Sequence, residues 1–289
     1  MVLCKYRHGQ RESVEISFFH SVDDAPDPNS FVRHCHDGYE LIYVARGEGS
    51  YVVEGEEYNL HASSLLILPP HAFHHVKIDL SEPYERYVVN FKDFILSEEV
   101  KRVLERMFES VEQYGRFYEG DGIPPSVVQA IASMQEVTHL SGAEAVCYLV
   151  SLLSTALLRL SVNAPILREQ EQTALGARVV RYLNSHLTET ISLDALAKSF
   201  FVSKFHLCRA FKEHNGVSVL QYLTEKRVMY ARHLVEHGET AVCAAAKAGF
   251  GDYSSFYRAH RRVYGVAPRS NRNAPVSHCG CGMKGAPLD

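Results

Sequence analysis

The hydrophobic pattern changes character once along the chain, near residue 97. Before that point, short apolar runs alternate with Gly-rich turns, which is typical of β-strands in a sandwich or barrel. We expect strands over residues 13–20, 40–45, 50–53, 58–60, 65–68, 75–78 and 84–91. From Ser97 onward the apolar residues recur three and four positions apart, which indicates helices.

Three helices are expected directly after the strands. The first begins after Ser97, which is a suitable N-cap, and the second begins at Pro124-Pro125 and runs to about residue 140. The third, over residues 142–161, is apolar on most of its faces and must therefore be covered. A partner subunit or burial within one domain would cover it equally well. No run of about 18 apolar residues is present, so we expect no membrane span.

The stretch 191–272 holds two short helical units joined by a longer helix over 217–236. In the first unit Ser192 is expected to cap one helix and Ser203 the next. The three residues between them, 200–202, are few and apolar, which predicts a tight buried turn. A first helix of the same region is expected over 175–187.

The second unit repeats the plan of the first. Thr240 is expected to cap a helix over 241–248, and Asp252 to cap one over 253–264. Gly249 is expected to adopt a positive φ at the intervening turn, and Gly265 ends the last helix.

The helix after Ser203 has the composition of a DNA-recognition helix. Leu207, Ala210 and Phe211 are expected to face inward. The residues left for the other faces are Lys204, Phe205, His206, Cys208, Arg209 and Lys212. Cations suit phosphates, and the remaining side chains suit base edges in a major groove.

The net charge of −4 hides an asymmetry between the two regions. Residues 1–172 carry 14 Lys and Arg against 26 Asp and Glu, whereas residues 173–274 carry 15 against 7. A basic C-terminal domain beside an acidic one fits a polyanion-binding module. Seven cysteines at scattered spacings argue against a disulfide framework and favour a reducing cytoplasm.

These patterns divide the chain into four parts. We expect a sensing and dimerisation domain over 1–162, a polar linker over 163–172, a DNA-binding domain over 173–274 and a disordered tail over 275–289. The tail contains His278-Cys279-Gly-Cys281, three soft ligands where a structural zinc needs four, so we expect no metal there.

The C-terminal third resembles the AraC/XylS family of transcription regulators. The resemblance is carried by Ser-Leu-x-x-Leu-Ala from Ser192, Ser-x-x-x-Leu-x-Arg-x-Phe-Lys from Ser203, Gly-Phe-x-Asp from Gly249 and Gly-Val-x-Pro from Gly265. Tyr222, Arg227 and Ala231 continue the same order of spacings between the units. The chain departs from the pattern at His260, where a Phe is usual, and at Asn271, where a Tyr is usual.

The resemblance implies which side chains face DNA. The expected interface residues are Ser203, Lys204, Phe205, His206, Cys208, Arg209, Lys212, Tyr253, Ser254, Tyr257, Arg258 and Arg261. Arg209 and Arg258 are expected to contact guanine, and Phe205 and Tyr257 to pack on thymine methyl groups. Lys204, Lys212, Arg261 and Arg262 are expected to contact phosphates. The competing role for Arg209 is a salt bridge across its own domain.

The N-terminal region resembles a cupin. His34-x-His36-x-x-x-Glu40, followed by Gly47, has the spacing of the first cupin motif, and Pro69-x-His71-x-x-His74 resembles the second with His71 in place of a Gly. Three interpretations stay open. His34, His36, Glu40 and His74 bind a divalent metal, or a pocket of Arg33, His34, His36, Glu40, Tyr43 and His74 binds a polar small molecule, or the histidines are purely structural. Arg33 has a rival role as a contact to the other domain.

Together these features predict an α+β two-domain protein. It has an N-terminal cupin-like β-barrel with trailing helices and a C-terminal all-α domain with two helix-turn-helix units. The function implied is a cytoplasmic, non-enzymatic transcription regulator, by resemblance an activator. Its expected partners are double-stranded promoter DNA, a polar effector such as a sugar, RNA polymerase and a second copy of the chain. The alternatives are a metal-dependent cupin enzyme carrying a DNA-binding domain, and a structural nucleoid protein, which would not explain the barrel.

Overall fold

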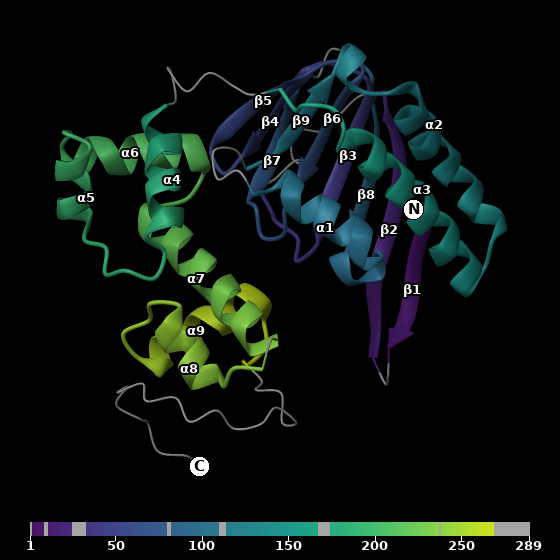
Figure 1. Ribbon diagram of the computed structural model, residues 1–289. Coiled ribbons are helices and arrows are strands. Elements are labelled where there is room, and N and C mark those ends of the chain that lie inside the picture. The colour runs from purple at the N-terminus through teal and green to yellow at the C-terminus, as the bar shows by residue number, and fades with distance from the viewer. Residues whose placement is uncertain are drawn as a thin grey trace. The chain divides into compact units, whose positions relative to one another are not determined.

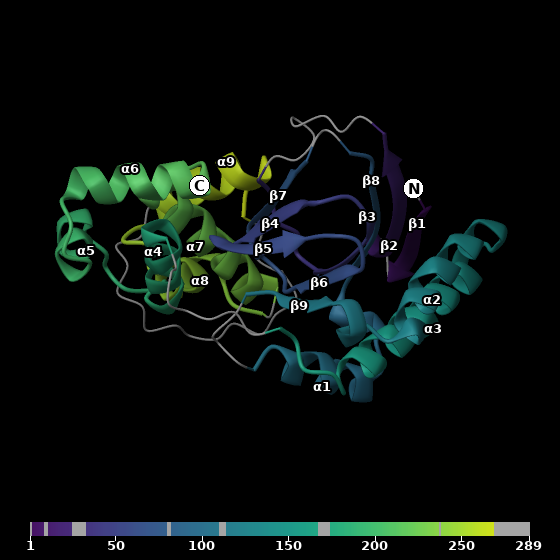
Figure 2. The same cartoon turned by 90° about the horizontal axis from the view of Figure 1, so that it is seen from above.

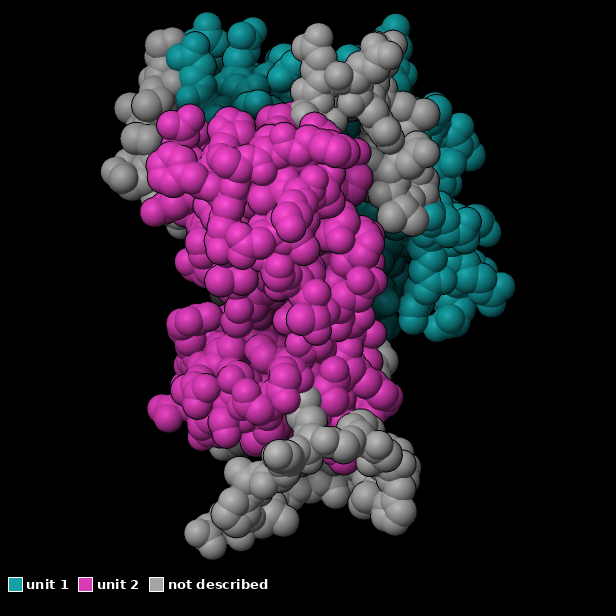
Figure 3. Space-filling model, turned by 90° about the vertical axis from the view of Figure 1, so that its left-hand side faces the viewer, with its two compact units in different colours: residues 1–172 teal, residues 173–289 magenta. Residues whose placement is uncertain are grey.

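A computed structural model describes residues 2–8, 11–24, 33–79, 82–109, 114–166, 174–236 and 238–268, with side chains described from residue 15 onward. The chain forms two compact units, residues 1–172 and 173–289 (Figure 3). We call them unit 1 and unit 2 and treat each by itself. The tail over 275–289 lies outside the described residues.

Unit 1 contains the strands, which pair antiparallel in two sheets. The larger sheet has the order β1-β2-β8-β3-β6-β9 and the smaller the order β5-β4-β7 (Figure 1). The bounds are β1 Val2–His8, β2 Arg11–Asp23, β3 Tyr39–Arg46, β4 Gly49–Val53, β5 Glu56–Leu60, β6 Ser64–Leu68, β7 His74–Ile78, β8 Tyr84–Phe91 and β9 Arg116–Glu119.

Two apolar cores lie on the two faces of the larger sheet. Ile42 and Val44 of β3 point into the core shared with the smaller sheet, together with Tyr51 of β4. Leu41 and Tyr43 of β3 point the other way, into the core beneath the helices. The central strand is therefore buried on both sides, which explains why its sequence is a continuous apolar run.

All seven expected strands are present, which confirms a β-rich N-terminal domain. The expected cupin-like β domain is present, and in its described part the ladders form two facing sheets that do not close into one (Figure 2). An isolated antiparallel bridge between His34 and His74 adds a short pairing outside these strands. Strands β1 and β9 were not expected from the pattern, since neither is a clear alternating run.

Helices cover the outer face of the larger sheet (Figure 2). They are α1 Glu98–Met107, α2 Pro125–Ser133, which continues as a 3₁₀ segment Met134–His139, and α3 Gly142–Leu160. The hydroxyl of Ser97 accepts a hydrogen bond from the amide of Val100, which confirms the expected cap. The side chain of Ser141 makes no such bond at the start of α3.

Helix α3 is half surface and half core. Among the described residues it is the one helix long and apolar enough to cross a membrane by length and composition, although 39% of the apolar window is buried in unit 1. Leu149, Leu153 and Leu157 are fully buried in the core, whereas Leu158 is 44% exposed. Burial within the domain therefore covers one face only, which is the pattern of an amphipathic helix.

Unit 2 is entirely helical in its described part. The helices are α4 Leu175–Ser185, α5 Leu193–Ser199, α6 Lys204–Asn215, α7 Val219–Glu236, α8 Ala241–Lys247 and α9 Tyr253–Tyr264. All four expected caps are confirmed, because the side chains of Ser192, Ser203, Thr240 and Asp252 each accept from a first-turn amide.

The two helix-turn-helix units use the same turn with different residues. Gly249 has φ 85°, as expected, and Phe201 holds the equivalent position with φ 57°. In each turn the next residue donates to the carbonyl five positions back, as Val202 does to Ala197, which is the Schellman arrangement. The expected buried turn is wrong at its centre. Phe201 is 96% exposed, because the left-handed backbone directs its side chain outward.

The loop over residues 186–190 contacts both helix-turn-helix motifs of unit 2. The guanidinium of Arg227 on α7 donates to the carbonyls of Leu187 at 2.8 Å and Glu189 at 2.5 Å. On the other side, a Cβ added to Gly249 would lie 2.7 Å from the carbonyl oxygen of Thr188. The loop therefore packs against both α7 and the turn after α8. These contacts limit the movement of the two helix-turn-helix motifs of unit 2 relative to each other.

We expect a buried histidine, His260, to make the stability of unit 2 depend on pH. His260 is 6% exposed, and its Nδ1 lies 2.9 Å from the Val266 carbonyl oxygen. Burial holds the pKa of His260 below its usual value of 6.5. The charge of Arg232 also lowers this pKa, whereas the hydrogen bond with Val266 raises it. Above pH 6.5 the imidazole is neutral in both the folded and the unfolded chain, and its contribution to stability is fully present. As the pH falls below 6.5, the unfolded chain binds a proton that the folded chain does not, so the free energy of unfolding decreases.

We therefore expect the urea midpoint of the full chain, followed by the helical signal at 222 nm, to fall between about pH 7.5 and pH 5.5. His260→Phe is expected to flatten this dependence. An equal slope in both proteins would contradict a role for His260.

Candidate functional site

Helix α6 presents a row of polar and aromatic side chains to solvent. Leu207 and Phe211 are fully buried and anchor the helix, whereas Phe205 is 76% exposed. The other expected interface residues that are exposed are Ser203, Lys204, His206, Arg209 and Lys212, and Cys208 is half-buried. The sequence therefore separated the inner and outer faces of this helix correctly, except that Ala210 is half-buried.

The ion pairs on α6 lie at the surface and are weak. The Arg209 guanidinium lies 3.8 Å from the Glu213 carboxylate one turn along the same helix, and both side chains are largely exposed. Lys204 lies 3.0 Å from Asp194 of α5, again at the surface. Exposed pairs of this kind contribute about 0.2–1 kcal/mol, so phosphates or bases can replace them.

Helix α9 has the same division of faces. Phe256 and Ala259 are buried, and Ser254, Tyr257, Arg258 and Arg261 are exposed. Tyr253 is half-buried, because its ring packs 5.8 Å from that of Phe256. Hydrogen bonds from Ser255 lower the pKa of the Asp252 carboxyl that caps the helix, so the cap stays ionised.

The interval between the two helices suits successive major-groove segments. Helix α6 packs against the start of α7 and α9 against its later half, with Ala231 and Val235 of α7 in the same core as Phe256. Helix α7 has 18 residues, which corresponds to about 27 Å of rise. One turn of DNA is about 34 Å, so the length of the connecting helix is of the same order as the interval between successive major-groove segments.

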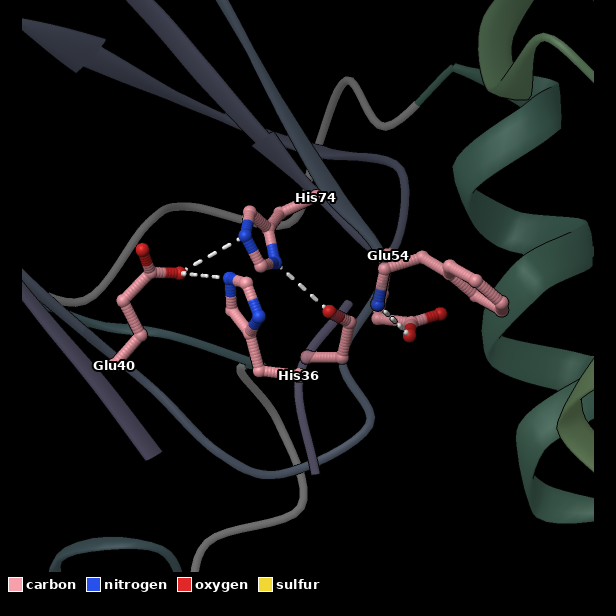
Figure 4. Close-up of polar contacts among 6 residues, drawn as sticks. His36, Glu40, Glu54 and His74 are labelled. Carbon is pink, nitrogen blue, oxygen red and sulfur yellow. Dashed lines mark hydrogen bonds and ion pairs between the residues drawn. The ribbon is translucent and has the colours of Figure 1, made fainter. Parts of the chain in front are cut away.

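A second site lies in unit 1, where the side chains of His36, Glu40 and His74 converge (Figure 4) and His34 lies close to the two histidines. We call His34, His36, Glu40 and His74 the histidine–glutamate cluster. The ligand nitrogens of the three histidines all lie within 4.8 Å of one another. The Glu40 Oε2 atom lies 2.9 Å from His74 Nε2 and 3.6 Å from His36 Nε2.

Two residues of the cluster are buried and two are accessible to solvent. Glu40 and His74 are 6% and 2% exposed, His36 is 36% exposed and His34 is exposed. Burial acts to raise the pKa of the Glu40 carboxyl, but the contact with His74 and the charges of the three histidines together lower it. Burial lowers the pKa of His36. The Glu40 carboxyl is therefore ionised at neutral pH.

Two residues expected in the pocket lie apart from this cluster. Tyr43 is three residues after Glu40 on β3, so its side chain points to the opposite face of the sheet, into the core beneath the helices. The Arg33 guanidinium stacks 3.6 Å from the centroid of the Phe73 ring. The structure thus brings together the four potential ligands and excludes Tyr43 from them.

Two residues near the candidate sites were not expected from the sequence. Glu54 is 2% exposed, and its carboxylate accepts a hydrogen bond from the Phe73 amide at 2.6 Å, next to His74 (Figure 4). Its position in the turn before Gly55 carries no signal of this role. Phe201, directly before α6, was expected to be buried but is 96% exposed.

These features define a class: a two-domain, ligand-responsive transcription regulator with two helix-turn-helix units. Two family models agree with it. Residues 19–153 match the AraC-like ligand binding domain, and residues 196–274 match a helix-turn-helix domain. The chain belongs to the AraC family of transcription regulators, and it is a DNA-binding regulator whose N-terminal domain binds a ligand.

Related proteins extend over nearly the whole chain. The HTH-type transcriptional activator RhaS of Escherichia fergusonii is 26% identical over 259 residues, covering 84% of this chain and 88% of the relative. RhaS of Salmonella arizonae is 26% identical over 281 residues, covering 89% and 97%. Among solved structures, ToxT from Vibrio cholerae O395 is 14% identical with a TM-score of 0.34, covering 88% of this chain and 95% of that one.

Proposed function

We propose that unit 2 binds a directional DNA site of two blocks, one read by α6 and the other by α9. The observation that carries the proposal is the pair of exposed arginines, Arg209 and Arg258, each on a recognition helix anchored by buried apolar residues. A guanidinium can donate two hydrogen bonds to O6 and N7 of guanine. Tyr257 and Phe205 supply apolar surface for thymine methyl groups.

The remaining cations of the interface serve a different purpose. Lys204, Lys212 and Arg261 are exposed and carry no base-specific geometry, so they bind phosphates. Ser203, His206, Cys208, Tyr253 and Ser254 complete the interface. Phe201 joins it as an exposed aromatic side chain directly before α6.

A selection from random duplex DNA with the full chain at fixed salt tests this proposal. We expect enrichment of one long, asymmetric sequence with two conserved blocks about one helical turn apart. Binding that is sensitive to salt but indifferent to sequence would contradict it and would favour a structural DNA-binding protein.

The sensor is proposed to bind a small polar effector at the histidine–glutamate cluster. The cluster is polar and partly open, with Glu40 on β3 and His74 on β7, which suits a molecule with hydroxyl or carboxylate groups. Arg33 precedes His34 in the chain and adds a guanidinium group. Binding there must favour one arrangement of the two units over another for transcription to respond.

The chain is further proposed to activate transcription, in the cytoplasm, through contact with RNA polymerase and as a homodimer. Activation rests on the RhaS relatives, whose names describe activators. The dimer rests on the exposed apolar part of α3, where Leu158 is 44% exposed and Val162, just after the helix, is 80% exposed.

Leu158→Asp is therefore expected to weaken the dimer about tenfold or more, because a charge would be buried in an apolar contact. Analytical ultracentrifugation of the full chain measures the change. Leu140→Asp is the matched control, since Leu140 is 38% exposed but lies before α3. A wild-type chain that stays monomeric at all concentrations would overturn the dimer.

A further inference from the structure

Unit 1 contains a cavity of about 290 Å³ between the C-terminal half of α1, strand β9 and residues 161–165. We call it the α1–β9 cavity, and we propose that it binds a small organic acid. It lies on the other face of the larger sheet from the histidine–glutamate cluster. Tyr118, which lines the cavity, belongs to the core beneath the helices, whereas Glu40 shares its face of β3 with Ile42, in the opposite core. The two sites are therefore separate.

Two arginines line the α1–β9 cavity from different elements. Arg116 of β9 is 3% exposed, and Arg106 near the end of α1 is exposed. The position of Arg116 is fixed, because its Nε donates to the Met107 carbonyl and its Cζ lies 5.2 Å from the centroid of the Phe108 ring. A guanidinium is planar and presents paired donors that match a carboxylate. The two side chains can therefore bind the acid group of a ligand.

The charge of the cavity wall favours an anion. None of the described residues that line the cavity is acidic, whereas two are arginines. Burial lowers the pKa of the Arg116 guanidinium, because desolvation opposes its charge, and a bound carboxylate would offset this cost. Tyr118 is 1% exposed, and burial raises its pKa to about 12, so its hydroxyl stays neutral. The wall is therefore positively charged at neutral pH.

The size and the apolar part of the cavity limit the rest of the ligand. Val103, Met107 and Pro165 supply apolar wall beside the arginines. A water molecule occupies about 30 Å³ of liquid, so the cavity has room for a ligand of about ten non-hydrogen atoms. An inorganic anion would leave the apolar wall uncovered, and a nucleotide or a long-chain fatty acid would not fit. A carboxylate on a short apolar body matches both parts of the wall.

One wall of the cavity is the segment that leads into the expected linker. The side chains of Ser161 and Asn163 line the cavity and donate to backbone carbonyls in the last turn of α3. Three residues further on, the Ile166 amide donates to the Phe117 carbonyl of β9 at 2.8 Å. A ligand in the cavity would contact both β9 and this segment. Binding is therefore expected to hold residues 161–166 more firmly against unit 1.

Benzoate is the probe for the test, because it joins one carboxylate to a short apolar ring. Isothermal titration calorimetry of the full chain measures its affinity. Benzyl alcohol keeps the ring without the charge, and inorganic phosphate keeps a negative charge without the ring. We expect saturable binding of benzoate, and affinities at least about tenfold lower for the other two, because each lacks one of the two contacts. Benzyl alcohol that binds as tightly as benzoate would contradict recognition by the arginines.

Three variants of the full chain locate the site on α1. Arg106→Gln is expected to weaken benzoate binding by about tenfold, since a charged hydrogen-bond donor is lost. Val103→Phe is expected to abolish binding, because the larger ring fills the cavity. Arg102→Gln is the matched control, since Arg102 is an exposed arginine on the same helix but does not line the cavity. Circular dichroism confirms that each variant is folded, and the buried Arg116 is left unchanged.

Hydrogen exchange gives a second readout. Benzoate is expected to slow exchange of the backbone amides over residues 161–166 in the wild type and not in Val103→Phe. His36→Gln separates this site from the histidine–glutamate cluster and is expected to leave benzoate binding unchanged. Loss of binding in His36→Gln but not in Arg106→Gln would place the acid at the cluster and overturn the proposal. Absence of benzoate binding in the wild type, or full affinity in Val103→Phe, would overturn it as well.

Discussion

Arg209→Ala is expected to cost about 1–3 kcal/mol in binding to the selected DNA site and to relax the preference at one base pair. The reason is geometric, since the side chain is exposed on α6 and, in the described part of the chain, is paired with Glu213 at 3.8 Å. Loss of that weak pair costs little, so the effect reports the contact to DNA. Titration by fluorescence anisotropy on the selected site and on each single-base variant measures both quantities.

Lys212→Ala is the matched control, because Lys212 is an exposed cation on the same helix. It is expected to weaken binding to all sequences alike and to reduce the salt slope by about one. An Arg209→Ala chain that behaves in this same way would reassign Arg209 to the phosphate backbone.

Gly249→Ala is expected to destabilise unit 2 by about 2–4 kcal/mol. Two costs combine at this position. Its φ of 85° is unfavourable for alanine, and an added Cβ would lie 2.7 Å from the carbonyl oxygen and 3.0 Å from the Cα of Thr188. These are backbone atoms of the loop that also binds Arg227, so the loop and the α8 turn must separate.

Gly216→Ala measures the cost of a positive φ without the steric clash that Gly249→Ala adds. Gly216 ends α6 with φ 75°, and an added Cβ would meet nothing within 4 Å. We expect a loss of about 1 kcal/mol from the left-handed backbone alone. Urea denaturation of the two full-length variants compares them, and equal losses would contradict the close approach of Thr188.

Most of unit 2 could be predicted from the sequence, because its signals are local. Caps at Ser192, Ser203, Thr240 and Asp252 need only a hydroxyl or carboxylate at the start of an apolar periodic run. Phe201 shows the limit of this reasoning. An apolar residue in a short turn suggested burial, but the φ of 57° that ends α5 turns the ring into solvent.

The sheet was harder to predict, since its pairing depends on distant segments. The strands themselves follow from apolar runs and turns, but nothing local shows whether the ladders close into a barrel. The cluster of His34, His36, Glu40 and His74 was expected from the resemblance to the two cupin motifs, and the contact of His74 with the others depends on a bridge between distant segments. Tyr43 was wrongly expected in the pocket, because side chains alternate along a strand and that of Tyr43 points to the opposite face from Glu40.

The central claim is that one chain reads two blocks at a fixed interval set by α7. The most direct test inserts five base pairs, about half a turn of DNA, between the two blocks of the selected site. We expect the affinity to fall to that of a single block, because the loop at residues 186–190 packs against α7 and the α8 turn together and so opposes a change in spacing. Unchanged affinity on the longer site would show that the two recognition helices bind independently, and would contradict the account.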